Sequence, residues 1–231
     1  MKAHHIAALI GCVGLSGIAL TDAFVQATTG HDSLFADDAG PLGAVLASDV
    51  WHGLTYAALT WVLIAEAGRF GAANRAARIC RWVLVVCLAA SAVSFVVIVP
   101  ALLLTDSGES AFAAVFGALG TPIFFGTILA AIALGFAVLR RNPLGVGGRV
   151  LLLILPVTAV VVALAFLAPA YAHPGWVETV VNVGIALVGV GAVAGTPAGS
   201  EASGAGAAGA ETDDAAGSGP GAGVSPSSSR P

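Results

Sequence analysis

Residues 82–104 read WVLVVCLAASAVSFVVIVPALLL and include no formally charged side chain. An α-helix rises about 1.5 Å per residue, so a run of about 20 apolar residues crosses the roughly 30 Å hydrocarbon core of a bilayer. The composition agrees, because 58% of the 231 residues are hydrophobic and only 10% are charged. Soluble domains carry about 25% charged residues. The sequence therefore predicts an all-α integral membrane protein of the cell membrane.

Apolar runs of comparable length recur along residues 1–195. They predict a bundle of six transmembrane helices, near residues 6–26, 48–67, 82–104, 111–138, 150–169 and 176–195. The segment 48–67 gives the weakest signal, because the ionisable residues Asp49 and Glu66 lie at its two ends. We therefore treat residues 1–195 as one six-helix transmembrane domain.

The first apolar segment has a second interpretation. Lys2 precedes it, and residues 25–27 would make a tolerable cleavage site for a signal peptide. Against this, the apolar run is longer than a usual signal sequence, and the region before it holds a single lysine. The sequence favours a retained helix and leaves the cleaved alternative open.

Residues 196–231 have a different composition from the rest of the chain. They consist mostly of Gly, Ala, Ser and Pro with a few acidic residues. Such a segment cannot bury enough apolar surface to offset the conformational entropy lost on ordering. We predict that it forms a disordered low-complexity tail.

The positive charges fall on alternate connections between the predicted helices. Residues 69–81 read RFGAANRAARICR and hold the densest group, and the connection at 140–149 holds the next. With Lys2, these residues all lie on one side of the membrane in a six-helix threading, and the intervening connections carry no Lys or Arg. Basic loops remain on the cytoplasmic side during insertion. We therefore predict that the N-terminus and the C-terminus are both cytoplasmic.

The basic segment also bears on partners. Arg69, Arg75, Arg78 and Arg81 would face anionic lipid headgroups, where each basic residue contributes about 1 kcal/mol. No nucleic-acid interface is predicted, because the segment is an isolated loop between two spans and lacks an interleaved aromatic platform. The partners we expect are the lipid bilayer and either a second copy of the chain or another membrane protein.

No motif typical of an enzyme or a cofactor site is evident. Cys12, Cys80 and Cys87 lie in or beside apolar runs without CxxC spacing, which is typical of small buried side chains. The chain has no HExxH, no GxSxG, no phosphate-binding glycine loop and no paired histidines at mid-membrane depth suitable for haem. We therefore predict no catalytic residue and no cofactor.

Ionisable residues near the outer ends of the predicted helices are the best candidates for a functional site. Charge at membrane depth is costly unless it is paired or hydrated. The weak candidates for a metal or proton site are Asp22, Asp49, His52 and Glu178. Asn182 follows Glu178 by one helical turn and is the deepest strongly polar side chain. The alternative for the acids is structural, because acidic residues at helix starts interact favourably with the helix dipole.

Small residues indicate where the helices pack. Gly11, Gly14 and Gly17 form a stripe on the first predicted helix, and Gly191 with Gly195 makes a GxxxG motif on the sixth. Such faces let helix backbones approach closely. Dimerisation through the second pair is one hypothesis.

Pro122 interrupts the longest predicted segment. A proline inside a helix removes a backbone hydrogen bond and can kink the helix. The surrounding sequence, GALGTPIFFG, adds three glycines. Pro122 is therefore a hinge candidate, with a tolerated kink as the alternative.

The sequence favours one of three functions. The favoured function is that of a non-catalytic membrane protein that associates with partners through its helices. The second is a small permease or channel-like protein with an outward-facing acidic and histidine site for a cation or a proton, and the third is an intramembrane enzyme. Convergence of Asp22, His52, Glu178 and Asn182 on one polar cavity would favour the second or the third. Side chains spread around the outer rim would favour the first.

Overall fold

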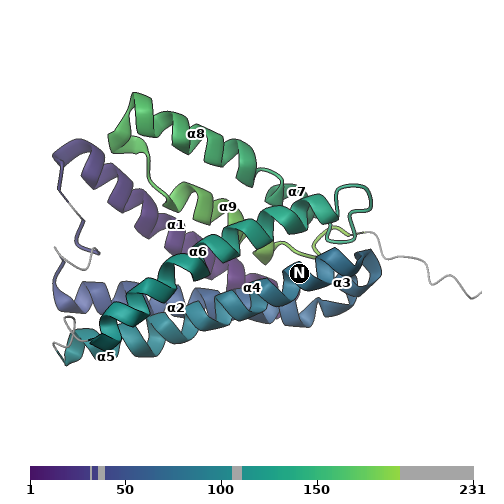
Figure 1. The fold of residues 1–231 in the computed structure, drawn as a ribbon, viewed down its shortest axis with the longest axis horizontal. Helices are drawn as coiled ribbons and strands as arrows, with labels where there is room; N and C mark the ends of the chain where they lie inside the picture. The colour runs from purple at the N-terminus through teal and green to yellow at the C-terminus, as the bar shows by residue number, and fades with distance from the viewer. Residues whose placement is uncertain (32, 36–39, 106–110, 193–231) are drawn as a thin grey trace, which may run out of the picture. The chain divides into compact units, whose positions relative to one another are not determined.

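The structure, a computed structural model, describes residues 1–31, 33–35, 40–105 and 111–192 (Figure 1). Within these residues all regular structure is helical, without β-strands. The described helices belong to one compact unit, Met1–Val193. The tail predicted to be disordered lies outside the described residues.

The described helices vary widely in length. They are α1 (Ala3–Thr29), α2 (Leu42–Ala65), α3 (Ala67–Ala73), α4 (Arg75–Val93), α5 (Val99–Leu104), α6 (Ala111–Ala137), α7 (Val146–Leu151), α8 (Ile154–Leu167) and α9 (Gly175–Ala186). A π-helical turn, Ser94–Ile98, joins α4 to α5, and a 3-10 turn, Pro169–Tyr171, precedes α9. The short helix α3 lies within the basic connection and was not predicted from the sequence.

Four helical segments of the described chain are long and apolar enough to cross a membrane. They are Ala3–Thr29, Arg75–Leu104, Gly117–Ala137 and Val146–Leu167. They correspond to the predicted segments near 6–26, 82–104, 111–138 and 150–169. The helical character predicted from the composition is thus confirmed, and these four segments are compatible with a membrane protein.

α2 occupies the predicted segment 48–67 but is not among the four apolar segments. It begins at Leu42 and ends at Ala65. Its sequence includes ionisable Asp49 and His52, and Asp49 is buried. Because the Asp49 side chain is buried in the protein, it does not add a charge to the lipid-facing surface of α2.

α9 is shorter than the predicted segment 176–195. It ends at Ala186, and the chain then turns through Gly189 at φ 88° and Gly191 at φ 66°. This left-handed conformation ends helices and favours glycine. Backbone hydrogen bonds join the turn to the start of α7. The prediction of a helix to residue 195 is therefore wrong, and Gly191 lies in a turn, whereas Gly195 lies outside the described residues.

Two prolines lie within long helices and have different local effects. Pro100 has no N–H, and its ring crowds the carbonyl of Val96. The helix accommodates it by widening into the π-helical turn just before it. Pro122 lies inside α6, which continues on both sides of it. A hinge at Pro122 therefore stays a prediction.

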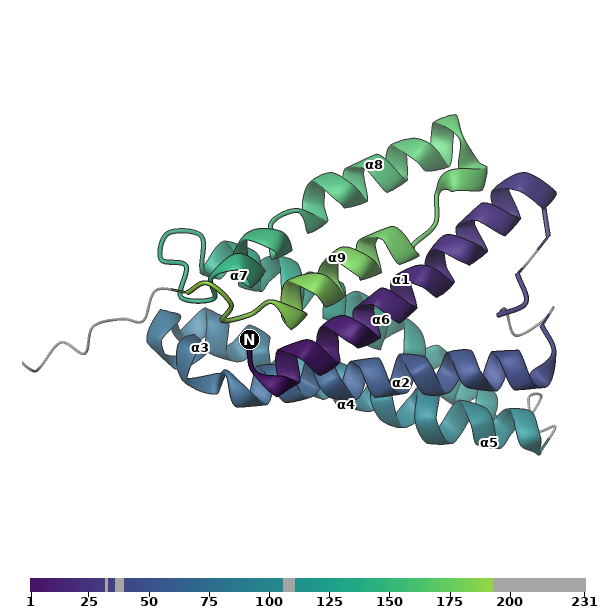
Figure 2. The same cartoon turned by 180° about the vertical axis from the view of Figure 1, so that it is seen from behind.

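α1 packs against α2 and α9 (Figure 2). Its Gly11 and Gly14 allow the close approach of α2, where Trp51 donates from Nε1 to the Gly11 carbonyl at 3.1 Å. A Cβ atom on Gly17 would have no neighbour within 4 Å. Two of the three glycines predicted to form a packing stripe therefore contact a neighbouring helix in the structure.

The connections between helices alternate between two ends of this unit. The N-terminus, α3 and the α6–α7 connection lie at one end (Figures 1 and 2). The end of α1, the start of α2 and the end of α8 lie at the other. α3, the first turn of α4 and α7 carry the basic residues Arg69, Arg75, Arg78 and Arg149, and they share one end. That this end is cytoplasmic stays a prediction.

The four arginines of the basic segment differ in exposure. Arg75 and Arg78 are exposed. Arg81 is buried and donates from Nη1 to a backbone carbonyl of α2 at 3.2 Å, and Arg69 donates from Nε to Glu66 Oε2 at 2.6 Å. Headgroup contact thus stays a prediction for Arg75 and Arg78, whereas Arg69 and Arg81 make contacts within the protein.

Replacing Gly14 with alanine is expected to destabilise the protein, because the new Cβ would overlap the Trp51 indole. Overpacking of this kind costs about 1–3 kcal/mol. Gly17→Ala on the same helix is the matched control, because its Cβ would meet nothing and alanine adds up to about 1 kcal/mol of helix propensity. Thermal unfolding in mild detergent should show a lower midpoint for Gly14→Ala alone. Equal midpoints would contradict this packing.

Candidate functional site

A cavity of about 330 Å³ lies between α2, α4, α6 and α9. We call it the Glu178 cavity. Ligand pockets typically measure about 300–1,000 Å³ and combine apolar walls with a few convergent polar groups. The cavity fits this description, because its walls are largely apolar and include a few polar side chains. The polar lining residues are His52, Tyr56, Ser91, Ser94, Thr127, Glu178 and Asn182, and the others are Leu88, Phe95, Val99, Gly120, Ile123, Phe124, Ile128 and Val181.

The carboxylate of Glu178 is the centre of the polar groups in this cavity. Glu178 lies in the first turn of α9, and its Oε1 accepts a hydrogen bond of 2.5 Å from the Tyr56 hydroxyl on α2. The amide of Asn182, one turn further along α9, donates to the same oxygen at 3.3 Å. Tyr56 and Asn182 are buried. Two donors on one oxygen suit a negatively charged carboxylate.

His52 also lines this cavity, and its ring is held by the protein. Its Nδ1 lies 2.8 Å from the carbonyl of Ser48, and a carbonyl can only accept, so Nδ1 carries a proton. In the neutral ring Nε2 is then the acceptor. The ring also stacks on Phe95, with centroids 5.2 Å apart and planes inclined by 24°. These contacts hold the imidazole in one orientation.

Residues close in sequence to Pro100 and Pro122 line two walls of the cavity. Ser94 and Phe95 belong to the π-helical turn, and such turns are frequent at functional sites. Gly120 and Phe124 come from α6 on either side of Pro122. Both prolines are therefore close in sequence to lining residues, and the π-helical turn is part of one wall.

A smaller cavity of about 110 Å³ adjoins the first. The two share the lining residues His52, Phe124, Glu178 and Asn182. Asp22 lines the smaller one and accepts a hydrogen bond from the Ser33 hydroxyl. Asp22, His52, Glu178 and Asn182 thus line two adjoining cavities.

The structure places the predicted site residues in different surroundings. His52, Glu178 and Asn182 line the Glu178 cavity, and Asp22 lines the smaller one. Asp49 is 5% exposed and lines neither. Within the described residues, the His, Cys, Asp and Glu side chains close enough together to hold a metal ion are His4, His5 and Glu66.

Several residues at these sites were not singled out by the sequence. Tyr56 lies four residues after His52, on the same helix face, and that spacing was the available signal. His4 and His5 lie together with Glu66 in the structure, although 62 positions separate His4 from Glu66. The adjacent histidines were visible in the sequence, but no spacing rule connects them to Glu66.

Comparisons with protein-family models, with curated proteins and with solved structures find no significant match to this chain. The functional argument therefore depends on the geometry of the site.

A double-mutant cycle of Tyr56→Phe and Glu178→Gln is expected to show favourable coupling between the two side chains. Interhelical hydrogen bonds in membrane proteins average about 0.6 kcal/mol and reach about 1.7 kcal/mol. Reversible unfolding in mixed micelles would measure the four free energies. Tyr171→Phe combined with Glu178→Gln is the control, because Tyr171 is 57% exposed and its effect should be additive. Equal coupling in both cycles would contradict the bond.

Proposed function

We propose that this protein is a small permease of the cell membrane that binds an organic cation in the Glu178 cavity. The observation that carries the proposal is the convergence of Glu178, Tyr56, Asn182 and His52 on one largely apolar cavity between helices. Cavities between helices are a common place for ligand sites in bundles. The same convergence supports a transport or enzyme role over association alone.

The proposed topology has six transmembrane segments with both termini cytoplasmic. Four apolar helices provide the lipid-facing segments. The remaining two segments, α2 and α9, carry more polar side chains. Seven of the twelve residues of α9 are buried, including Asn182. A short helix surrounded by protein tolerates polar side chains and irregular ends that lipid would not. Arg75 and Arg78, both exposed, would lie at the cytoplasmic headgroups.

The lining of the cavity favours an organic cation over a hydrated metal ion. Among the described lining residues, Glu178 is the carboxylate and none is lysine or arginine. Calcium and magnesium take about six or more oxygen ligands, far more than one carboxylate supplies. The rings of Tyr56, Phe95 and Phe124 offer aromatic surfaces, which attract quaternary ammonium groups. A carboxylate beside such rings suits a cation that carries apolar substituents.

The chain in mild detergent is expected to bind benzyltrimethylammonium, and Glu178→Gln should weaken that binding by about 10- to 100-fold. This range corresponds to the roughly 1.5–3 kcal/mol of an interaction with a charged group. Isothermal titration calorimetry would measure it. Glu201→Gln, which changes an acid outside the described residues, is the matched control. Equal affinity of Glu178→Gln and Glu201→Gln, or no heat in the wild type, would argue against this function.

The proposed topology predicts opposite labelling of two exposed positions. On a background without the three native cysteines, His31→Cys should react with an impermeant maleimide in intact cells, whereas Ala72→Cys should react only after permeabilisation. His31 follows α1, and Ala72 belongs to α3 at the opposite end of the unit. Gel-shift analysis would report the labelling. Reaction of both positions in intact cells would rule out this threading.

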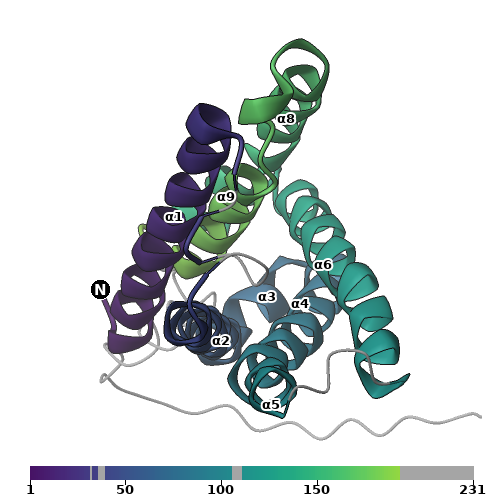
Figure 3. The ribbon, with the colours of Figure 1, turned by 90° about the vertical axis from the view of Figure 1, so that its left-hand side faces the viewer.

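α8 favours a second candidate function, association with another membrane protein or a second copy of this chain. Only 11% of the apolar window within Val146–Leu167 is buried, and Phe166 and Leu167 are 84% and 83% exposed. In Figure 3, α8 lies beyond α9 as seen from α2. A partner helix would cover such a face by side-chain packing. The Glu178 cavity is not needed for this second function, so Glu178→Gln separates the two.

A further inference from the structure

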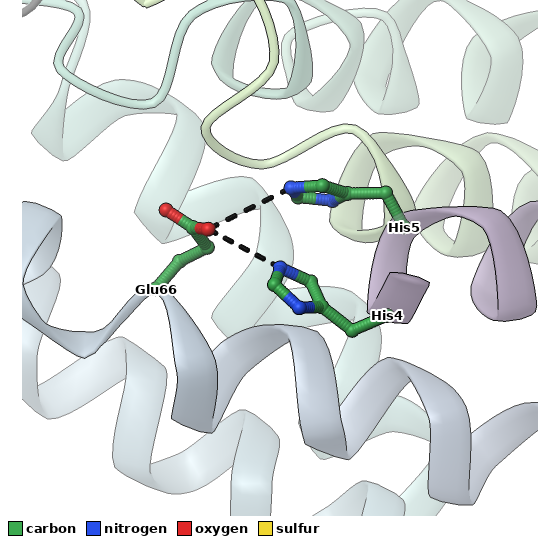
Figure 4. A group of neighbouring side chains, drawn as sticks. All are labelled: His4, His5 and Glu66. Carbon is green, nitrogen blue, oxygen red and sulfur yellow. Dashed lines mark hydrogen bonds and ion pairs between the residues drawn. The ribbon is translucent and has the colours of Figure 1, made fainter. Parts of the chain in front are cut away.

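His4, His5 and Glu66 form a buried cluster at the basic end of the helices (Figure 4). The two histidines lie in the first turn of α1, and Glu66 directly follows α2. They are 7%, 3% and 4% exposed, respectively. Figure 4 shows both imidazole rings directed toward one oxygen of the carboxylate. Buried ionisable groups that converge in this way are found at metal sites as well as in ion pairs.

The hydrogen bond of His5 to the protein backbone determines which ring nitrogen is available. Its Nδ1 lies 3.0 Å from the carbonyl of Ala186, so Nδ1 must carry a proton. The neutral ring then directs the lone pair of Nε2 at Glu66 Oε1, 3.6 Å away. Nε2 and Oε1 are then two neighbouring lone-pair donors, and a cation bound by both atoms would stabilise this arrangement. Metal-binding histidines commonly donate their other nitrogen to a backbone carbonyl in this way.

The distances in the cluster match those between ligands of one metal ion. Ligand atoms about 2.0–2.1 Å from a tetrahedral ion are about 3.3 Å apart. His4 Nε2 and His5 Nε2 lie 3.2 Å and 3.6 Å from Glu66 Oε1. One ligand atom from each of the three residues lies within 4.8 Å of the other two. Small shifts of the rings would therefore bring three ligand atoms to the spacing of a tetrahedral site.

The two basic side chains at Glu66 have different roles in this arrangement. Arg69 donates from Nε to Oε2 at 2.6 Å, which orients the carboxylate and leaves Oε1 toward the histidines. Lys2 Nζ lies 2.7 Å from Oε1, but the Lys2 side chain is 62% exposed. The carboxylate end of this ion pair is buried, whereas the lysine end extends into solvent. The Lys2 ammonium can therefore leave Oε1 to an entering cation.

We propose that His4, His5 and Glu66 bind a divalent first-row transition metal ion, with zinc as the best fit. Two imidazoles and one carboxylate are a known zinc ligand set, whereas calcium and magnesium prefer oxygen ligands alone. Arg69 and the Ala186 carbonyl orient the ligands. The ion would join the start of α1, the end of α2 and, through Ala186, the end of α9. This site is separate from the Glu178 cavity and does not depend on the proposed transport.

The test is a titration of the full chain, produced without a polyhistidine tag and stripped of metal with a chelator. Co²⁺ is the probe, because its visible absorption reports nitrogen and oxygen ligands, and Zn²⁺ then displaces it. The wild type is expected to bind one equivalent. His4→Gln and His5→Asn keep hydrogen-bonding groups near the original nitrogens but remove the metal-binding lone pairs. Each should weaken Co²⁺ binding by more than about 100-fold, beyond what loss of an outer-shell partner costs.

Two further variants test whether the Co²⁺ signal comes from this cluster. His31→Ala, an exposed histidine at the other end, should bind Co²⁺ like the wild type. Lys2→Met should bind Co²⁺ at least as tightly as the wild type, because the competing ammonium is gone. Absence of a Co²⁺ signal in the wild type, or wild-type affinity in His4→Gln and His5→Asn, would overturn the proposal and leave the cluster as an ion-pair network.

Discussion

The polar side chains of α2 and α9 must be satisfied by one another, because most residues around them are apolar. Glu178 Oε1 accepts hydrogen bonds from Tyr56 on α2 and from Asn182 on α9. Leaving one of these groups unpaired would cost its full desolvation free energy. This requirement determines how the first turn of α9 lies against α2. The Glu178 cavity follows from it, since the remaining walls are built from α4, the π-helical turn and α6.

α9 connects the two sites of the molecule. Its first turn carries Glu178, and its last residue, Ala186, accepts a hydrogen bond from His5 of α1. Glu66, at the end of α2, contacts His5 at the same end of the helices. One short helix is therefore held at both ends, by α2 near the cavity and by α1 near the cluster. A displacement of α9 would change the geometry of both sites.

Much of the candidate site could be predicted, because polar residues stand out in an apolar sequence. Asp22, His52, Glu178 and Asn182 were selected on that ground, and they line two adjoining cavities. The same reasoning also selected Asp49, which lines neither, because sequence position does not tell which way a helix face turns. Tyr56 was overlooked because a tyrosine is unremarkable in a helix until its hydroxyl has a partner. The cluster around Glu66 was overlooked because its members are far apart in the chain.

The sequence by itself determined the helical class of the protein, the location of its four long apolar segments and the alternation of basic connections. These properties depend on local composition and length, which each segment carries independently of its neighbours. Only the tertiary structure decided that α9 ends at Ala186 and that Arg81 turns inward. It also decided that a Cβ atom at Gly14 would meet Trp51 while one at Gly17 would meet no neighbour. It also brought Tyr56 to Glu178 and His5 to Glu66. Such pairings depend on the packing of segments distant in the chain, and hydrophobicity alone does not specify them.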